Sequence, residues 1–411
     1  MNYLIKMLIY GLYFGVIFGR MLFNHLIDEK RDIKMKNKQL TVWEAACIIT
    51  GYGVGGGVMA MPYLAAKNGV VSAFIILILA FAASWLLHMM IAEVAVKCGE
   101  GSQIVSVFSR FLFRGRGKTA LTIGFFVLMA IVLVTNLTAY IVGAAEIIAE
   151  LLGVSLFVAQ IIFYVAAASV VIFGLKAVGI SEKYTVAVIF GLIAALAVAS
   201  FLKPVNALPV AMGTMTDGVA YFAMAMLSFA AFFSIPQAVE GLGGDEKKIK
   251  KAVFLGIGNN FILIVVITLA ALISSGEVTE VAMIGWSRGI GQWAEIIGGV
   301  FTILAMLTTY WSISLALAGI VQEQLKFNER LCWLLATLPS LILTLLGIGG
   351  FIDFLELAGG AIAIIVAVMV VPTYRNARRE VPGSMLGKLG SPAFQILTVI
   401  AYLLMAIGSL I

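Results

Sequence analysis

The stretch 50–63 contains the residues with the clearest potential for chemistry, and that potential lies in the main chain. It reads TGYGVGGGVMAMPY, with glycines at 51, 53, 55, 56 and 57 and a proline at 62. Each glycine weakens a helix by about 1 kcal/mol relative to alanine, and an internal proline weakens it by about 3 kcal/mol. We therefore expect a helix that opens near its middle, where the freed amides and carbonyls can bind a small charged solute.

The elements that position this stretch are membrane helices. The chain has 411 residues, of which 62% are hydrophobic and 12% are charged, and its apolar runs repeatedly exceed the length of about 18 residues that is typical of a membrane span. Open backbone is tolerated inside a bilayer only where protein or a polar cavity surrounds it. We therefore predict an all-α polytopic membrane protein with eleven core spans, at residues 41–67, 70–95, 120–148, 156–174, 183–202, 218–241, 252–274, 292–320, 331–347, 351–372 and 393–410.

The basic residues predict the orientation of these spans. Of the 27 Lys and Arg, only Lys67, Lys203 and Arg288 fall in loops that we assign to the outside, while Lys6 and Arg20 precede the first core span. By the positive-inside rule, we expect a multi-pass protein of the cell (plasma) membrane with the N-terminus of its core in the cytoplasm and its C-terminus outside. The basic loops suit anionic membrane lipids, so the net charge of +6 gives no reason to expect nucleic acid.

Residues 1–40 combine an apolar segment with a basic stretch and lie ahead of the predicted core. Residues 3–18 fit an extra N-terminal helix or an uncleaved signal anchor, and a natural start at Met35 is the third alternative, which we favour. Residues 104–113 alternate apolar and polar at helical spacing. They fit an interfacial helix or, as we favour, a surface connector.

Several ionisable side chains fall within or beside the spans. We expect His88 to donate to a carbonyl of a neighbouring helix rather than to relay protons. Glu44 and Glu93 lie near inner ends, where we expect them to be hydrated, with an inner gate or a proton step as the alternative. Asp353 and Glu356 lie near the outer mouth of the tenth span.

The sixth predicted span contains a second interruption. Pro236 lies about two thirds of the way along the segment 217–245 and follows several small residues. Paired interrupted helices at corresponding places are a pointer to a midplane site in secondary transporters. We predict a 5+5 inverted repeat with broken helices 1 and 6, its halves at 41–202 and 218–372 and an eleventh span at 393–411.

The two breaks would present opposite partial charges. After the first break, free amides at about 55–58 form the partly positive start of a helix, which suits a carboxylate. Before the second break, carbonyls at about 228–231 offer partial negative charge to an ammonium group. This pattern needs no charged side chain, which fits the absence of one near either break in the sequence. An α-amino acid is the simplest ligand with this pattern.

The glycines also allow two other interpretations. Gly51-x-Gly53-x-x-Gly56 matches a dinucleotide fingerprint, but that motif needs a preceding strand and a βαβ unit, which a membrane span cannot supply. The pairs Gly51/Gly55 and Gly53/Gly57 match a helix-packing pattern. The second break favours a binding site over packing alone.

With both breaks in view, the chain resembles the bacterial and archaeal members of the amino acid/auxin permease family, near the aromatic (tyrosine/tryptophan) permeases of the amino acid–polyamine–cation superfamily. The resemblance rests on VGGGVMAMPY at 54–63, FFSIPQAVE at 232–240 and FTILAMLTTYWSISLALAG at 301–319, which are similar to family motifs in spans one, six and eight. It covers about residues 41–371 and implies a LeuT-like fold with eleven spans.

The resemblance also implies site residues. It assigns Gly55, Gly56 and Gly57 to a carboxylate cradle, and it places Thr308 and Thr309 at a cation site completed by carbonyls of span one. The alternative for both threonines is a hydrogen bond within their own helix, and Na⁺ and H⁺ both stay open as the coupling ion. The substrate-binding candidates are Gly53, Gly55, Gly56, Gly57, Tyr140, Ser228, Phe229, Ala230, Ala231 and Phe232; the ion-coupling candidates are Gly51, Thr308 and Thr309; Pro62 and Pro236 mark the helix breaks.

These observations predict a secondary active transporter, an ion-coupled symporter that takes up a neutral, hydrophobic or aromatic amino acid by alternating access. A permease for another nitrogenous solute, such as a polyamine, is the alternative and would favour acidic side chains at the breaks. An ion channel would need a polar stripe along several helices. An enzyme would need clustered catalytic residues, and we expect no cofactor beyond Na⁺ or H⁺; the oligomeric state stays open. The three cysteines have no zinc-type spacing, so we predict neither disulfide nor metal from Cys47, Cys98 and Cys332.

Overall fold

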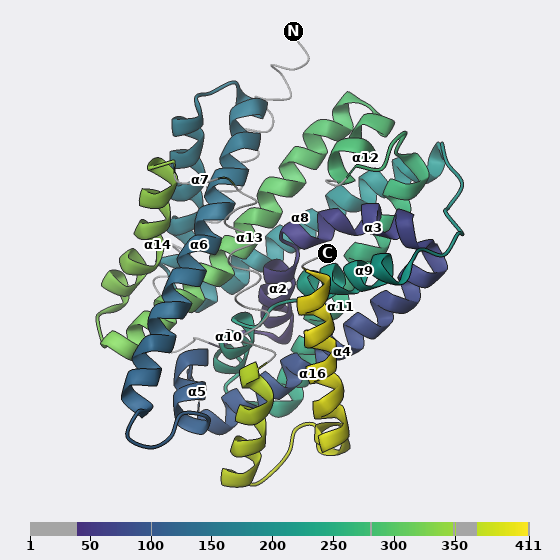
Figure 1. Ribbon diagram of the computed structural model, residues 1–411. Coiled ribbons are helices and arrows are strands. Elements are labelled where there is room, and N and C mark those ends of the chain that lie inside the picture. Colours follow the sequence, from purple (N-terminus) through teal and green to yellow (C-terminus); the bar gives the residue numbers. More distant parts are fainter. Residues whose placement is uncertain (1–38, 100, 280–281, 348–349, 351–367, 410–411) are drawn as a thin grey trace.

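The protein is a bundle of helices (Figure 1). The computed structural model describes residues 39–99, 101–279, 282–347, 350 and 368–409, and within these ranges the chain forms helices and loops without a strand. The predicted helical class is therefore confirmed. The N-terminal segment and most of the predicted tenth span, including Asp353 and Glu356, lie outside the described residues.

The helices follow one another with short connections. The first part of the chain contains α2 (Val42–Gly53), the short 3-10 helix η1 (Gly56–Ala60), α3 (Met61–Asn68), α4 (Val70–Cys98), α5 (Ile104–Phe111), α6 (Lys118–Leu152), α7 (Leu156–Val171) and α8 (Leu175–Leu202). The second part contains α9 (Met215–Ser228), α10 (Ser234–Gly241), α11 (Glu246–Ser274), α12 (Ala282–Ile290), α13 (Gln292–Leu325), α14 (Glu329–Leu345), a helical stretch over residues 368–380, η2 (Gly387–Gly390) and α16 (Pro392–Gly408).

The observed helices match most of the predicted spans. Five of the described helices, α4, α6, α8, α11 and α13, are long and apolar enough to cross a membrane, and α2 with α3 makes a sixth if the bent pair is one span. The helix α5 lies where we favoured a surface connector, so that preference was wrong. The helix α12, between α11 and α13, was not expected at all.

The start of α8 is a further correction. We expected the fifth span to begin at residue 183, but α8 begins at Leu175. The polar residues Ser181, Glu182 and Lys183 lower the local hydropathy, and this moved the predicted start of the span towards the C-terminus. In the structure Ser181 and Glu182 are buried, because this end of α8 packs between α2 and α13 rather than against lipid.

The helix α2 begins with a capping box, in which Glu44 N–H donates to Thr41 Oγ1 at 3.2 Å and Thr41 N–H donates to Glu44 Oε2 at 2.8 Å.

The first break is made by the glycines at the other end of α2. The helix ends at Gly53, and the chain that continues from Gly57 to Asn68 turns by 58°. Pro62 falls in the first turn of α3, where a missing N–H removes no helical hydrogen bond. Pro62 therefore starts the second half-helix rather than opening the first.

The second break lies between α9 and α10. The amide of Phe229 closes the last turn of α9 by donating to Ala225 O at 3.1 Å, and Ala230 N–H donates to Leu227 O at 3.0 Å. The helix resumes at Ser234, which puts Pro236 in the first turn of α10. Both interrupted helices are therefore confirmed at the expected places.

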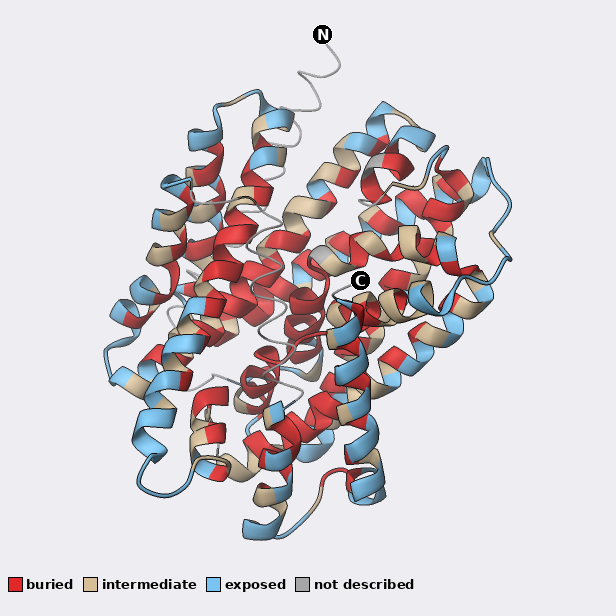
Figure 2. Cartoon of the chain, viewed as in Figure 1, coloured by how far each residue is buried: buried red, intermediate tan, exposed pale blue. Residues whose placement is uncertain are grey.

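The broken helix α2 lies in the buried interior of the bundle, where it packs against α8, α11 and α13 (Figures 1 and 2). One close contact is with α11 at Gly256. A Cβ built on Gly256 would lie 2.6 Å from Ile49 Cβ and 2.9 Å from Ala46 O. Only glycine allows this approach, so the packing of α2 depends on a small residue of α11 as well.

One end of the bundle, which we call the α5 end, is held together by polar contacts. There Gln103 N–H donates to Glu323 Oε1 at 2.9 Å and Asn376 Nδ2 donates to Phe111 O at 2.8 Å. The first residues of α2 and the last of α10 meet at this end, since Leu40 N–H donates to Gly241 O at 2.6 Å.

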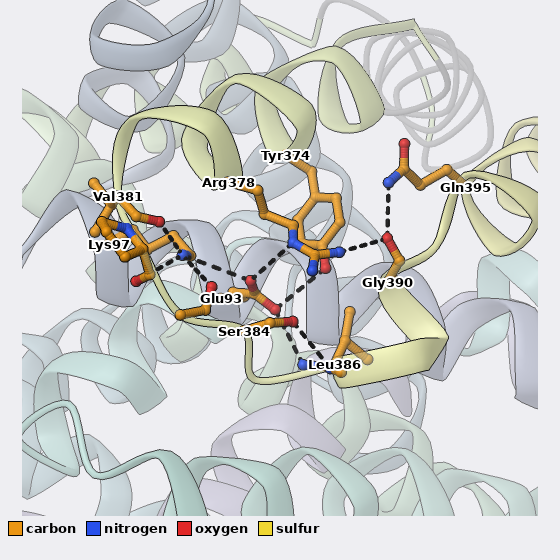
Figure 3. A network of polar contacts seen from close by, with 12 residues as sticks. Glu93, Lys97, Tyr374, Arg378, Val381, Ser384, Leu386, Gly390 and Gln395 are labelled. Carbon is orange, nitrogen blue, oxygen red and sulfur yellow. Dashed lines mark hydrogen bonds and ion pairs between the residues drawn. The ribbon is translucent and has the colours of Figure 1, made fainter.

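Glu93 anchors the loop that follows residues 368–380 (Figure 3). Its Oε2 accepts from Tyr374 Oη at 3.2 Å and from Leu386 N–H at 3.1 Å, while its Oε1 lies 3.8 Å from Lys97 Nζ and 3.9 Å from Arg378 Nε. Only 1% of Glu93 is exposed. The expectation that Glu93 is hydrated was wrong, because the loop over residues 381–390 folds back across it.

Candidate functional site

The first break lies beside two hydroxyl groups. No side chain caps Gly55, the residue ahead of η1, and the first amides of any helix lack partners within it. A Cβ built on Gly55 would lie 2.9 Å from Tyr140 Oη and 3.2 Å from Thr309 Oγ1. The structure therefore brings the first break, Tyr140 of α6 and Thr309 of α13 together, as the resemblance implied.

The two breaks also face each other. A Cβ on Gly57 would lie 2.7 Å from Ser228 Oγ, and one on Gly53 would lie 3.0 Å from Ser228 O. The same Cβ on Gly53 would overlap the amide nitrogen of Asn260 on α11. The glycines at 53 and 57 are thus needed for close approach to the last turn of α9.

Asn260 is a site residue that the sequence did not single out. It is fully buried, and neither Nδ2 nor Oδ1 has a hydrogen-bond partner among the described residues. A buried amide without partners is costly. Its position beside Gly53 and Ser228 makes it available to a polar ligand at the breaks.

The main chain of the second break is partly occupied by the protein itself. Ala231 O accepts from Ser234 N–H at 3.1 Å, and Phe229 O accepts from Ser84 Oγ at 3.4 Å. Of the four carbonyls predicted at 228–231, that of Ser228 lies beside the first break, with its oxygen 3.0 Å from the Cβ position of Gly53.

His88 of α4 fixes the second break. Its Nε2 accepts from Ala231 N–H at 2.9 Å, so the ring proton lies on Nδ1 and is donated to Ser84 O at 2.6 Å. We expected a donation to a neighbouring helix; the carbonyl in fact belongs to α4. The ring also stacks on Phe232, with centroids 5.0 Å apart. His88 therefore satisfies an amide that the interruption of the helix leaves without an intrahelical carbonyl.

The aromatic rings of the second break point in two directions. Phe229 packs against Phe81 of α4 and Phe261 of α11, with ring centroids 5.9 Å and 6.4 Å away. Phe232 lies between His88 and Tyr402. Both phenylalanines therefore pack against helices other than the first broken helix. The rings of Phe233 and Tyr52, by contrast, lie 6.4 Å apart and connect the two broken helices.

The predicted ion-coupling residues lie together. Gly51 O accepts from Thr308 Oγ1 at 3.2 Å and from Thr309 Oγ1 at 3.0 Å. Both hydroxyls also lie within 3.0 Å of Ala305 O in their own helix. Each threonine hydroxyl is therefore within hydrogen-bond distance of a carbonyl of its own helix and of a carbonyl of the first broken helix. One turn further on, Ser312 Oγ lies 3.3 Å from Ile48 O and 3.0 Å from Glu182 Oε1.

Glu182 is a buried acid beside the predicted ion-coupling residues, and the sequence analysis did not single it out. Its side chain is fully buried, and a Cβ built on Gly51 would overlap its Oε2 and lie 2.7 Å from its Cδ. This carboxyl arrives from α8 and not from either broken helix, so the absence of charged residues next to the breaks in the sequence does not extend to their surroundings in the fold. Had α8 been placed from Leu175, the rule that intramembrane acids are functional by default would have drawn attention to it.

Glu44 lies closer to the α5 end and is paired. Its Oε2 is 2.7 Å from Lys176 Nζ and its Oε1 is 3.9 Å from Lys183 Nζ. Only 4% of Glu44 is exposed, so the expectation that it is hydrated was also wrong. Among the described residues, no group of three or more His, Cys, Asp and Glu is placed to hold a metal ion.

Comparison with known proteins shows the family of the chain. Residues 38–409 match the tryptophan/tyrosine permease family. The chain belongs to this family. The permease is also similar to Glutamine transporter 2 of Aliivibrio fischeri, with 24% identity over 360 residues that cover 82% of this chain and 90% of that protein.

Two solved structures resemble the permease in fold. Mhp1, a nucleobase-cation-symport-1 family transporter in a closed conformation with bromovinylhydantoin bound, superposes with a TM-score of 0.63 at 15% identity and covers 91% of this chain and 92% of its own. MhsT in complex with L-phenylalanine gives a TM-score of 0.62 at 14% identity, covering 91% and 100%. The permease thus has the LeuT-like fold, and it is a secondary transporter for amino acids and not an enzyme.

Proposed function

We propose that this permease is an ion-coupled symporter for a neutral amino acid, with hydrophobic and aromatic amino acids as the first candidates. The observation that carries the proposal is the meeting of the two breaks, where Gly53 and Gly57 approach Ser228. The start of a half-helix suits the carboxylate of the substrate, and the Ser228 carbonyl suits its ammonium group. A zwitterion needs both poles at once, and the two helix ends supply them within one site.

The substrate side chain is the less constrained part. The family description favours tryptophan and tyrosine, and Tyr52 and Phe233 offer aromatic surface beside the breaks. The relative named as a glutamine transporter supports a neutral polar side chain, for which the unpaired amide of Asn260 is a suitable partner. Both options share the neutral α-amino acid.

The arrangement in the membrane follows from the same proposal. We propose eleven core spans with halves at 41–202 and 218–372, the start of α2 at the cytoplasmic side and the C-terminus outside. The α5 end of the bundle is then the cytoplasmic end, where Leu40 and Gly241 join the two broken helices. Its basic loops face anionic lipids.

Uptake into proteoliposomes tests the function. Labelled tryptophan, tyrosine, phenylalanine, leucine, glutamine and a diamine are offered in turn under a sodium gradient and, separately, under a proton gradient. We expect accumulation of at least one neutral amino acid, driven by one of the gradients. Accumulation of the diamine alone, or ionic current that does not depend on any solute, would overturn the proposal.

A pair of glycine variants tests whether uptake depends on the first break. Gly55→Leu fills the space beside Tyr140 and Thr309 and should abolish uptake. Gly191→Leu is the matched control, since Gly191 lies on an exposed face of α8 with nothing within 4 Å of its Cβ position. Equal loss in both variants would point to misfolding and not to the site.

A further inference from the structure

We propose that the carboxyl of Glu182 is the proton-binding group of the permease, neutral when buried as described here and releasing its proton when the α5 end opens. The inference rests on the proposed symport, for which it names the coupling ion and the atom that carries it. Four features of the structure support it: burial, a missing hydrogen-bond donor, the close approach of Gly51, and the lack of a counter-charge among the described residues.

The burial of Glu182 makes an ionised state expensive. The side chain has no exposed surface, and an isolated carboxylate in such surroundings is strongly disfavoured unless it is paired. Its Oε1 receives one hydrogen bond, from Ser312 Oγ at 3.0 Å, and its Oε2 receives none from the described residues. A single hydroxyl does not replace the solvation of a full negative charge.

The surroundings of Glu182 are rich in acceptor oxygens and poor in donors. The carbonyls of Ile48, Gly51 and Ala305 share the three hydroxyl protons of Thr308, Thr309 and Ser312. A proton on the carboxyl adds a donor to a cluster that lacks one. It also removes the repulsion between a carboxylate and the partial negative charges of these carbonyls.

Gly51 packs closely against one side of Oε2. A Cβ added to Gly51 would overlap this oxygen, so the carboxyl lies close to the opened main chain of the first break. A proton can neutralise the carboxyl where it lies, without movement of α2, whereas a sodium ion needs several oxygen ligands around a space of its own.

No basic group compensates Glu182 directly. Lys176 and Lys183, on the same helix, pair with Glu44 instead, at 2.7 and 3.9 Å, and no described basic group forms a salt bridge with Glu182. Cys47 on α2 is a further ionisable neighbour, which interacts electrostatically with Glu182, Lys183 and Glu44. The remaining ionisable groups on the helices packed against α8 are Tyr52 on α2, Tyr164 on α7, Glu240 on α10, Glu246, Lys247, Lys248, Lys250 and Lys251 on α11, Arg288 on α12, and Glu295, Tyr310 and Glu323 on α13.

The closed α5 end separates Glu182 from solvent. A Cβ on Gly179, about one turn before Glu182, would lie 2.6 Å from Leu40 Cδ2 and 3.5 Å from Glu44 Cβ. Leu40 and the Glu44–Lys176 pair therefore lie between the carboxyl and this end of the bundle. When they part, water reaches Glu182, the O–H bond breaks, and the proton passes to water on the cytoplasmic side. The carboxylate takes up its next proton from water on the outer side, once the site has turned to that side.

The test compares Glu182→Gln with Glu146→Gln in proteoliposomes that contain a pH-sensitive dye. The amide of Glu182→Gln has nearly the shape of the protonated carboxyl and cannot release a proton. We expect this variant to exchange labelled amino acid across the membrane but to show no substrate-driven acidification. If one proton moves with each substrate, a tenfold proton gradient gives at most about tenfold accumulation in the wild type, and about none in the variant. Glu146→Gln is the matched control, because Glu146 is an exposed carboxylate on α6, and it should retain acidification.

The opposite pattern would overturn the proposal: acidification kept in Glu182→Gln, or lost only in Glu146→Gln. Accumulation in the wild type that follows a sodium gradient and ignores the proton gradient would overturn it as well. A measurement without substrate separates this inference from the proposed function. Infrared spectroscopy of the wild type should show the carbonyl stretch of a protonated carboxyl at neutral pH, and Glu182→Gln should lack that band. Its presence unchanged in the variant would refute the assignment even if no amino acid proved to be transported.

Discussion

Replacing Gly53 by alanine separates two roles that a glycine can have in a broken helix. If Gly53 only weakened α2, alanine would stabilise the protein by about 0.5–1 kcal/mol, the difference in helix propensity. If Gly53 is needed for the approach of the second break, the added methyl group must displace its neighbours. The two roles predict opposite signs for the change in the free energy of unfolding.

The structure favours the second role. The new Cβ would overlap Asn260 Nδ2 and lie 3.0 Å from the main-chain oxygen of Ser228. Asn260 is fully buried, so its amide can move only into packed surroundings, and such overpacking costs about 1–3 kcal/mol. After subtraction of the propensity gain, we expect a net loss of about 0–2.5 kcal/mol in stability. Uptake should fall further, by about tenfold for each 1.4 kcal/mol of lost substrate binding.

Thermal unfolding in detergent and uptake in proteoliposomes measure the two effects. The matched control is Gly258→Ala on α11, two residues before Asn260, because a Cβ at Gly258 meets nothing within 4 Å. This control should be stabilised by about 0.5–1 kcal/mol and should transport normally. If Gly53→Ala were as stable as the control and transported at the wild-type rate, the contact between the first break and Asn260 would be refuted.

Three further substitutions test separate parts of the structure. Gly256→Ala should lower the melting temperature through an overpacking cost of about 1–3 kcal/mol, because its Cβ would lie 2.6 Å from Ile49 Cβ; an unchanged melting curve would contradict the close packing of α2 and α11. His88→Leu should destabilise the protein by about 1–3 kcal/mol, since Ala231 N–H loses its acceptor, while His88→Gln retains an acceptor and should recover part of the loss in the same melting assay. Tyr140→Phe removes the hydroxyl beside Gly55. This change should raise the KM for uptake by roughly 2–10-fold, as expected for the loss of one hydrogen bond of about 0.5–1.5 kcal/mol. An unchanged KM would mean that the substrate binds elsewhere.

The two breaks could be predicted because their cause is local. Five glycines within seven residues weaken α2 whatever surrounds them, and the helix does end at Gly53. Proline at 236 likewise restricts the helix around it, and α10 does begin just before it. The prolines at 62 and 236 both lie in the first turn of a resumed half-helix, so each follows a break and does not interrupt a helix.

The partners of the breaks could not be predicted, because they come from distant parts of the chain. His88, Glu182 and Asn260 lie on three different helices, α4, α8 and α11, and no spacing in the sequence relates them to residues 51–57 or 228–231. Glu182 was further hidden by its polar neighbours, which moved the expected start of the fifth span past it. Only the packing of α8 against α2 places this carboxyl beside Gly51.

The sequence by itself determined that this protein is helical, that it belongs in a membrane, and that two of its helices open midway, since apolar length and weak helix propensity are properties of contiguous residues. The tertiary structure decided which side chains meet the opened backbone. It did so because a buried polar group must find its partner across helices, and that choice depends on how the helices pack.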